Sequence, residues 1–215
     1  MRRCLAVLAA MTWLVVPLAA QQTRLTEGQI KAAEAEMPEL VKLLELKPGM
    51  TVADIGAGFG AWTVRFAKVV GPSGRVYATD IGTAQLAALR EYTQREGLTN
   101  VTVLEGAVDS TNLPAGCCDA ILIRDAYHHL TQPEPIIKSV ASALKPGGRF
   151  AVIDFPPRAK SELPAGVPKD RGGHGVPPAV IVNEVGAVLT HAQTIDKWGP
   201  GSEPASLFLV LFRKK

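Results

Sequence analysis

The sequence predicts an α/β domain: a doubly wound, mostly parallel sheet with helices on both faces and a C-terminal antiparallel hairpin. Three observations support this prediction. Short apolar runs alternate with segments of helical periodicity from residue 50 onwards. Glycine and proline clusters separate these segments. The last two apolar runs have no helix between them. Strands separated by helices pair in parallel through right-handed crossovers, whereas two directly joined strands form a hairpin.

A helix is expected before the first strand. From Thr26 to Leu46 the apolar residues recur at helical spacing, and Lys47-Pro48-Gly49 ends the run. Pro38 lies inside this helix. Because proline lacks a backbone N–H and its ring clashes with the preceding turn, we expect the helix to be kinked or broken there.

The remaining elements follow in alternation. Strands are expected over residues 50–55, 75–79, 101–104, 119–124, 149–154, 192–197 and 207–212. Helices are expected over residues 61–70, 83–96, 134–144 and 178–189. The proline- and glycine-rich stretch from Pro156 to Gly175 is too irregular for a core element, so we interpret it as a loop or lid. Residues 199–202 are expected to join the two final strands.

The first twenty residues form a separate segment. Arg2 and Arg3 precede an apolar run that ends in Ala19-Ala20, and polar residues follow from Gln21. This is the pattern of a signal peptide cleaved after Ala20. We therefore expect residues 1–20 to direct export, to the periplasm in a bacterium, and residues 21–215 to form one domain without stable membrane insertion. An uncleaved segment would instead anchor the protein to the membrane.

Composition narrows the class of partner. The chain has 215 residues, of which 47% are hydrophobic, and a formal net charge of only +3. Without a dominant basic block, the charge gives no support for a nucleic-acid partner. We expect a small-molecule partner.

The two cysteines of the expected domain are adjacent. A bond between Cys117 and Cys118 would close a strained ring and cross-link no loop, so we expect no disulfide. At about 3.3 Å per residue, both cysteines lie roughly 20 Å from the carboxyl end of the strand at residues 119–124. A substrate site built on a thiol is therefore disfavoured.

A glycine-rich loop carries the strongest functional signal. The segment Asp54–Gly60 (DIGAGFG) follows an expected strand and opens an expected helix. There, backbone amides and the helix dipole can meet a ligand at the carboxyl edge of the sheet. The same residues, followed by Asp80 later in the sequence, also fit a loose dinucleotide-binding pattern. The glycines alone therefore leave a nicotinamide cofactor possible.

Three motifs together resemble the class I, Rossmann-like, seven-strand methyltransferases that use S-adenosylmethionine (SAM). The segment Val52–Gly60 resembles the first motif of that family, and Ala78-Thr79-Asp80-Ile81 resembles the end of its second strand. The segment Leu144–Phe150 resembles the turn before its fifth strand. The resemblance covers roughly Leu40–Phe155 and implies methyl transfer from SAM to a small-molecule acceptor.

The resemblance also implies roles for individual residues. Asp54 is expected near the methionine end of SAM, and Asp80 is expected to accept hydrogen bonds from both ribose hydroxyls. Asp109 is the nearest match to the family's adenine-reading acid, although its spacing departs from the commonest one. The expected cofactor-binding residues are Asp54, Gly56, Ala57, Gly58, Gly60, Asp80, Ile81, Asp109 and Asp125.

A pair of histidines follows the strand at residues 119–124. Similar small-molecule methyltransferases carry a Tyr-His-His or related pair at this edge, which faces the transferable methyl group. Since neighbouring side chains on an extended segment point opposite ways, we expect one of His128 and His129 to face the pocket, and we choose His128 as the general base. His174 is the second choice.

Two alternatives stay open beside this interpretation. A metal site would gather His128 or His129 with Asp125 and His174, but the segment matches no known metal motif, so no metal is expected. A domain that binds SAM without catalysis is the other alternative, because SAM is made in the cytosol and an exported enzyme lacks an obvious supply.

Overall fold

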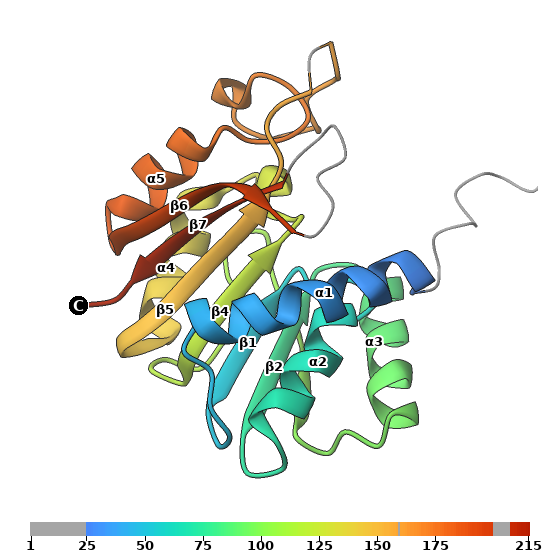
Figure 1. The fold of residues 1–215 in the computed structure, drawn as a ribbon. Coiled ribbons are helices and arrows are strands. Elements are labelled where there is room, and N and C mark those ends of the chain that lie inside the picture. Colours follow the sequence, from blue (N-terminus) through green and yellow to red (C-terminus); the bar gives the residue numbers. More distant parts are fainter. Residues whose placement is uncertain (1–24, 159, 200–206) are drawn as a thin grey trace, which may run out of the picture.

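The computed structural model describes residues 25–158, 160–199 and 207–215, and it confirms the expected fold class (Figure 1). One sheet runs in the order β3-β2-β1-β4-β5-β7-β6. Its strands are β1 (Thr51–Ile55), β2 (Arg75–Asp80), β3 (Val101–Glu105), β4 (Cys118–Arg124), β5 (Leu144–Asp154), β6 (Thr190–Trp198) and β7 (Leu207–Arg213). Neighbours from β3 to β5 pair in parallel, and β7 lies antiparallel between β5 and β6. The C-terminal antiparallel hairpin is thereby confirmed.

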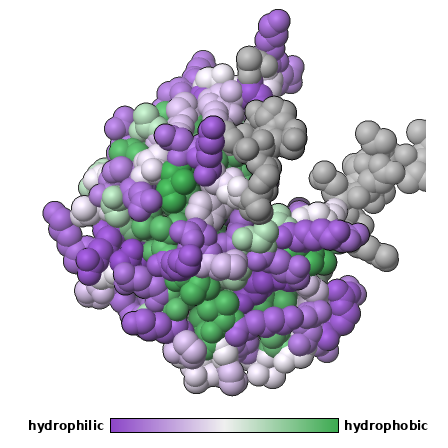
Figure 2. All heavy atoms as spheres, viewed as in Figure 1, coloured by the Kyte–Doolittle hydropathy of each residue, from purple (hydrophilic) through white to green (hydrophobic). Residues whose placement is uncertain are grey.

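Helices cover both faces of this sheet. They are α1 (Glu27–Leu43), α2 (Ala61–Val70), α3 (Thr83–Arg95), α4 (Pro133–Ala143) and α5 (Pro178–Gly186). Helices α1 and α2 pack on one face, with α3 beside α2, and α4 and α5 pack on the other (Figure 1). Hydrophilic side chains dominate the surface seen in Figure 2, with apolar patches between them.

Alternating side chains of each strand supply the two cores. Along β4, Ile121 and Ile123 join the core under α4 and α5, whereas Ala120 and Leu122 join the core under α1 and α2. This follows from the two-residue period of a strand, which sends neighbouring side chains to opposite faces. A strand buried on both faces therefore reads as a continuous apolar run.

The first helix differs from expectation at its proline. Thr26 caps α1 in a capping box with Gln29, and the helix then continues through Pro38 to Leu43. The helix is therefore not broken at Pro38. Because Pro38 lies on the exposed side of the helix, water can hydrogen-bond the carbonyl that proline leaves without its intrahelical donor.

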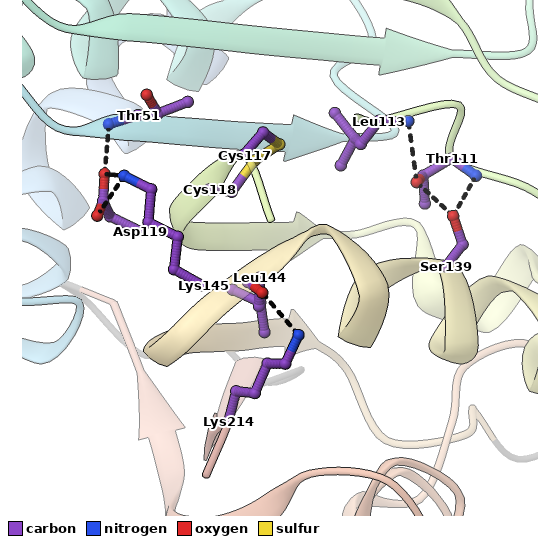
Figure 3. Close-up of a disulfide and its surroundings, with 10 residues drawn as sticks. All are labelled: Thr51, Thr111, Leu113, Cys117, Cys118, Asp119, Ser139, Leu144, Lys145 and Lys214. Atoms are coloured by element: carbon purple, nitrogen blue, oxygen red, sulfur yellow. Dashed lines mark hydrogen bonds and ion pairs between the residues drawn. A yellow bond between two sulfur atoms is a disulfide. The ribbon is translucent and has the colours of Figure 1, made fainter. Parts of the chain in front are cut away.

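The cysteine expectation is also wrong. The structure joins Cys117 and Cys118 in a disulfide between adjacent residues at the start of β4 (Figure 3). Only Cys118 belongs to the strand. Because Cys117 precedes it, strand alternation does not hold the two side chains on opposite faces. The bond lies at the end of β4 that is remote from the strand's carboxyl end.

The segment expected to be a loop or lid is irregular over the residues described. It contains the short 3-10 helix η3 (Lys169–Arg171). The expected signal peptide lies outside the described residues, as do residues 200–202 of the expected hairpin turn. No helix within the described ranges is long and apolar enough to span a bilayer.

Strand order defines where a ligand can bind. From β1 the chain proceeds outwards to β2 and β3, and then returns to place β4 on the other side of β1. Crossovers therefore leave β1 in opposite directions, and a crevice opens at the carboxyl ends of β1 and β4.

Candidate active site at the carboxyl edge of the sheet

A cavity of about 520 Å³ lies at this crevice. Gly58 and Asp80 line one side of it, and Asp125 and His129 line the other. A smaller cavity of about 140 Å³ adjoins it and is lined by Asp54, among others. The glycine loop contributes to both cavities, so the two form one site with a deep branch beside β1.

Gly58 and Gly60 of the glycine loop have different structural roles. Gly58 has a φ of 53°, and a Cβ atom built there would meet no protein atom within 4 Å. Such a Cβ would enter the space available to a ligand. Gly60 has a φ of 87°, and a Cβ there would collide with Leu89 of α3. Gly60 therefore allows α2 and α3 to pack closely and does not line either cavity.

Asp80 holds the loop in place. One of its carboxylate oxygens accepts a hydrogen bond from the Gly58 N–H at 2.9 Å, and the other accepts one from the Gly82 N–H at 2.9 Å. Each oxygen keeps a further acceptor position, as two ribose hydroxyls require. Beside it, Ile81 is 63% exposed and also lines the cavity.

Asp54 is buried at the end of β1. Thr63 donates a hydrogen bond to its carboxylate at 2.6 Å. Burial raises the pKa of Asp54 to about 6, because desolvation outweighs the stabilising bond from Thr63. Nearby Ala57 also lines the smaller cavity, so the expected neighbourhood of Asp54 and the glycine loop is present.

Sequence reasoning missed a buried ion pair that fixes one wall of the site. Glu36 of α1 accepts hydrogen bonds from Nε and Nη2 of Arg124, at the end of β4, and one from the indole of Trp62. The guanidinium of Arg124 also lies 3.9 Å from the Trp62 ring centroid. This network ties α1 to the sheet, so that Gln29 reaches the cavity. The signal in the sequence was a glutamate four residues before the buried Leu40, on the apolar stripe.

Two of the acids expected to bind the cofactor differ in their position relative to the cavities. Asp125, with a φ of 55°, lines both cavities, and burial raises its pKa. Asp109 is exposed and lines neither cavity, although its neighbours Val108 and Ser110 line the larger one. Asp109 therefore does not line the cavity in this structure, and its expected role in cofactor binding stays a prediction.

The histidine pair does not lie on an extended segment. Tyr127–His129 form the 3-10 helix η2, so the argument that neighbouring side chains point to opposite sides does not apply. The rings of His128 and His129 are 4.0 Å apart between centroids. His129 is exposed and lines the cavity, whereas His128 is buried and is not among the lining residues.

His128 is held by an acid at the end of β5. Its Nδ1 lies 2.8 Å from Oδ1 of Asp154, and its backbone N–H donates to the other oxygen at 3.1 Å. Since an ionised carboxylate only accepts hydrogen bonds, this contact assigns the proton to Nδ1. In the neutral ring, Nε2 then keeps its lone pair.

The lid is joined to the body by a second buried network. Arg171, which is fully buried, contacts Glu184 of α5 at 3.0 Å. Tyr127 donates a hydrogen bond to the same carboxylate at 2.6 Å. The histidine turn and the lid therefore share one anchor. Nothing in the sequence distinguishes Arg171 from the other cationic residues of the Pro- and Gly-rich stretch, Arg158, Lys160 and Lys169.

The site and fold can be compared with known proteins. Residues 46–200 match the family model described as "Methyltransferase domain". The chain is 32% identical over 116 residues to the ubiquinone/menaquinone biosynthesis C-methyltransferase of Ectopseudomonas mendocina, and 31% identical over 111 residues to that of Pasteurella multocida. The matches cover 54% and 51% of this chain, and 45% and 41% of those proteins. The chain thus spans less than half the length of these relatives.

Among solved structures, a SAM-dependent methyltransferase from Aquifex aeolicus aligns with a TM-score of 0.63 and 25% identity. The alignment covers 89% of this chain and all of that one. With the match to the family model over residues 46–200, this excludes the nicotinamide alternative that the glycine pattern left open. The chain belongs to the class I SAM-dependent methyltransferases.

Proposed function

We propose that the protein methylates a small, largely apolar molecule that binds on the His129 side of the cavity. One observation carries the proposal: a single cavity joins the cofactor residues Gly58 and Asp80 to a wall that contains His129. Ile123, Leu130 and Ile136 also line it. Apolar walls with few polar groups are typical of small-molecule sites.

The acceptor class follows from the chemistry of that wall and from the relatives. Methyl transfer from a sulfonium is an in-line displacement with a good leaving group, so the protein must mainly align the acceptor and exclude water. The two relatives named above are C-methyltransferases of quinone biosynthesis. We therefore propose a ring acceptor with a phenolic hydroxyl or the acidic carbon beside it.

Such an acceptor needs a base, and the geometry favours His129 over His128. His129 lines the cavity, and its pKa is lowered by desolvation and by the neighbouring imidazoles, so its neutral form is favoured. His128, buried and bound to Asp154, is then a positioning residue for its neighbour.

The test is methyl transfer from isotopically labelled SAM to a panel of phenols, hydroquinones, amines and thiols. We expect labelled product from one of the two ring classes, with loss of transfer in Asp80→Ala. SAM binding by calorimetry with no transfer to any acceptor would support the non-catalytic alternative and overturn the proposal.

We also propose that residues 1–20 direct export and are removed. The charged start, the apolar run and the small residues at 19–20 support this. Mass spectrometry of protein from a bacterial host should find an N-terminus near Gln21 in the periplasmic fraction. An intact Met1 on a cytosolic protein would contradict export.

A further inference from the structure

Three of the four histidines in the chain meet beside the cavity. The ligating nitrogens of His128, His129 and His174 all lie within 4.8 Å of one another. The ring centroid of His174 is 4.9 Å from that of His128 and 5.6 Å from that of His129. Histidine 174 comes from the lid, so the cluster unites two segments that are distant in sequence.

Backbone hydrogen bonds fix the position of His174. Its N–H donates to the Ser161 hydroxyl at 2.9 Å, and its carbonyl accepts from the Arg158 N–H at 2.9 Å. The Val176 N–H donates to the Phe155 carbonyl at 3.0 Å. The lid thus returns along the chain that leaves β5, and this return places His174 beside the other two rings.

One member of the cluster is already arranged as metal ligands commonly are. Asp154 is fully buried and holds Nδ1 of His128, which leaves Nε2 for a ligand. A carboxylate behind a histidine fixes the tautomer and makes the free nitrogen a better donor. The same acid also accepts the N–H of Phe155 at 2.9 Å, so its orientation is set by the backbone.

We propose that His128, His129 and His174 bind a divalent transition metal ion, with Zn²⁺ as the simplest candidate. Imidazole nitrogens suit Zn²⁺, and three protein ligands with one open position are typical of catalytic zinc sites. At zinc–nitrogen distances of about 2.0–2.1 Å, tetrahedral ligands are separated by about 3.3 Å. The nitrogens must therefore move together by at most about 1.5 Å, which side-chain rotation of the exposed His129 and the half-buried His174 can supply.

The surrounding charge also suits a cation. Two acids lie close to the cluster, since ligating oxygens of Asp125 and Asp154 fall within 4.8 Å of a nitrogen of His128. The nearby guanidinium of Arg158, 4.6 Å from the centroid of the Phe155 ring, opposes a cation, so the two carboxylates must outweigh it. Three neutral imidazoles alone would leave both ion charges uncompensated, so these carboxylates would stabilise the bound ion.

A bound ion would deepen the proposed function, and this step rests on it. At the open position, the ion would hold the acceptor oxygen and favour its deprotonated form. A nitrogen that binds a metal has no lone pair left to accept a proton. The ion would therefore replace His129 as the activating group. Binding of the metal can be measured without knowledge of the acceptor.

The test is Zn²⁺ titration of chelator-treated protein under non-reducing conditions, by calorimetry and by competition with a chromophoric chelator. We expect one ion per chain at micromolar or tighter affinity. His174→Ala should weaken binding at least about 100-fold and Asp154→Asn about 10- to 100-fold. His191→Ala, which removes the remaining histidine outside the cluster, should change nothing. Co²⁺ should give the visible spectrum of a tetrahedral nitrogen site.

Two results would overturn the metal site: no binding of Zn²⁺ or Co²⁺, or binding that His174→Ala leaves unchanged. SAM affinity and circular dichroism of each variant show that the protein is folded. Methyl transfer that persists in metal-free protein without Zn²⁺ binding would remove the metal and keep the proposed function. Stoichiometric Zn²⁺ binding without transfer to any acceptor would keep the metal site and remove the proposed function.

Discussion

The two sides of the cavity are built in different ways. The cofactor side uses backbone amides and acids from one βαβ unit, because Asp80 at the end of β2 binds the N–H of Gly58 in the loop after β1. The proposed acceptor side uses side chains from the turn after β4 and from α4, such as His129 and Ile136. Beside this wall, His174 of the lid is held by its own loop contacts and lies close to His129. A local motif thus forms the proposed cofactor side, whereas tertiary contacts form the proposed acceptor side.

The electrostatics differ in the same way. On the cofactor side, burial raises the pKa of Asp54. On the acceptor side, partial desolvation and the neighbouring imidazoles lower the pKa of His129, although its side chain is exposed. Desolvation thus shifts both equilibria towards the neutral form, although Asp54, with a pKa of about 6, is still mostly ionised at pH 7.5. A cationic ligand such as SAM would favour the ionised form of Asp54, whereas a metal or a proton-donating acceptor would use the neutral imidazole.

The largest expected effect tests whether the two sides act separately. His129→Ala should lower the rate of methyl transfer by roughly 10² to 10⁴ while SAM affinity barely changes. Whether His129 acts as a base or as a metal ligand, it serves the acceptor and does not contact SAM. Single-turnover kinetics and SAM calorimetry measure the two quantities. His128→Ala and His174→Ala show which imidazole matters most. A parallel loss of SAM affinity would mean that the two sides are coupled.

The pH dependence of that rate has a definite sign. Protonation of His129 removes its lone pair, so the rate should fall as the pH drops through its pKa. Because that pKa is lowered, the acid limb should lie below the ordinary histidine value of 6.5. The limb should vanish in His129→Ala. A limb above pH 6.5 would point to another group.

The next largest effect tests close approach at the cofactor loop. Gly58→Val should weaken SAM binding by at least about 100-fold, because its side chain enters the cavity. Gly97→Val is the matched control, since Gly97 has a φ of 66° and also meets no atom within 4 Å of a built Cβ, but lies outside both site cavities. Equal losses of SAM binding in both variants would assign the effect to backbone strain.

Ionisation of the buried Asp54 should lower the free energy of unfolding of the folded chain. Its pKa is about 6 in the folded chain and 3.8 in the unfolded reference, so between these values the folded chain holds a proton that the unfolded chain has released. Stability from this group therefore falls as pH rises through that window, by an amount on the order of 3 kcal/mol.

Asp54→Asn removes the ionisation. The variant should gain stability over the wild type at pH 7.5, and the gain should shrink towards pH 4, while SAM binding weakens. Urea unfolding at the two pH values measures this, with the exposed Asp109→Asn as control. A variant that is less stable than the wild type at pH 7.5 would show that the bond from Thr63 matters more than burial.

Much of the molecule could be predicted from sequence because its signals are local. Hydrophobic period and glycine clusters predicted the strands, and the segment Asp54–Gly60 indicated the edge of the sheet at which the structure has its cavity. The ion pair of Glu36 with Arg124 joins residues 88 apart in sequence. The meeting of His174 with His128 depends on how the lid returns. A break at Pro38 and the absence of a disulfide were wrong expectations, because local rules omit which side of the helix faces solvent and where the strand begins.

The smallest effect distinguishes two acids that the family resemblance treats alike. Asp80→Ala should weaken SAM binding at least about tenfold, since charge-assisted hydrogen bonds are worth on the order of 1.5 to 3 kcal/mol. Part of that loss would come from the Gly58 N–H, which loses its acceptor. Asp109→Ala should leave the affinity unchanged, because Asp109 is exposed and lies outside the cavity lining. Calorimetry of both variants shows which criterion identifies the acids that bind SAM. One criterion is a place in the cavity lining, and the other is a match to the family motif. A tenfold loss in Asp109→Ala would mean that SAM draws the loop at residues 106–110 inwards, and the cofactor side would then also be completed by tertiary rearrangement.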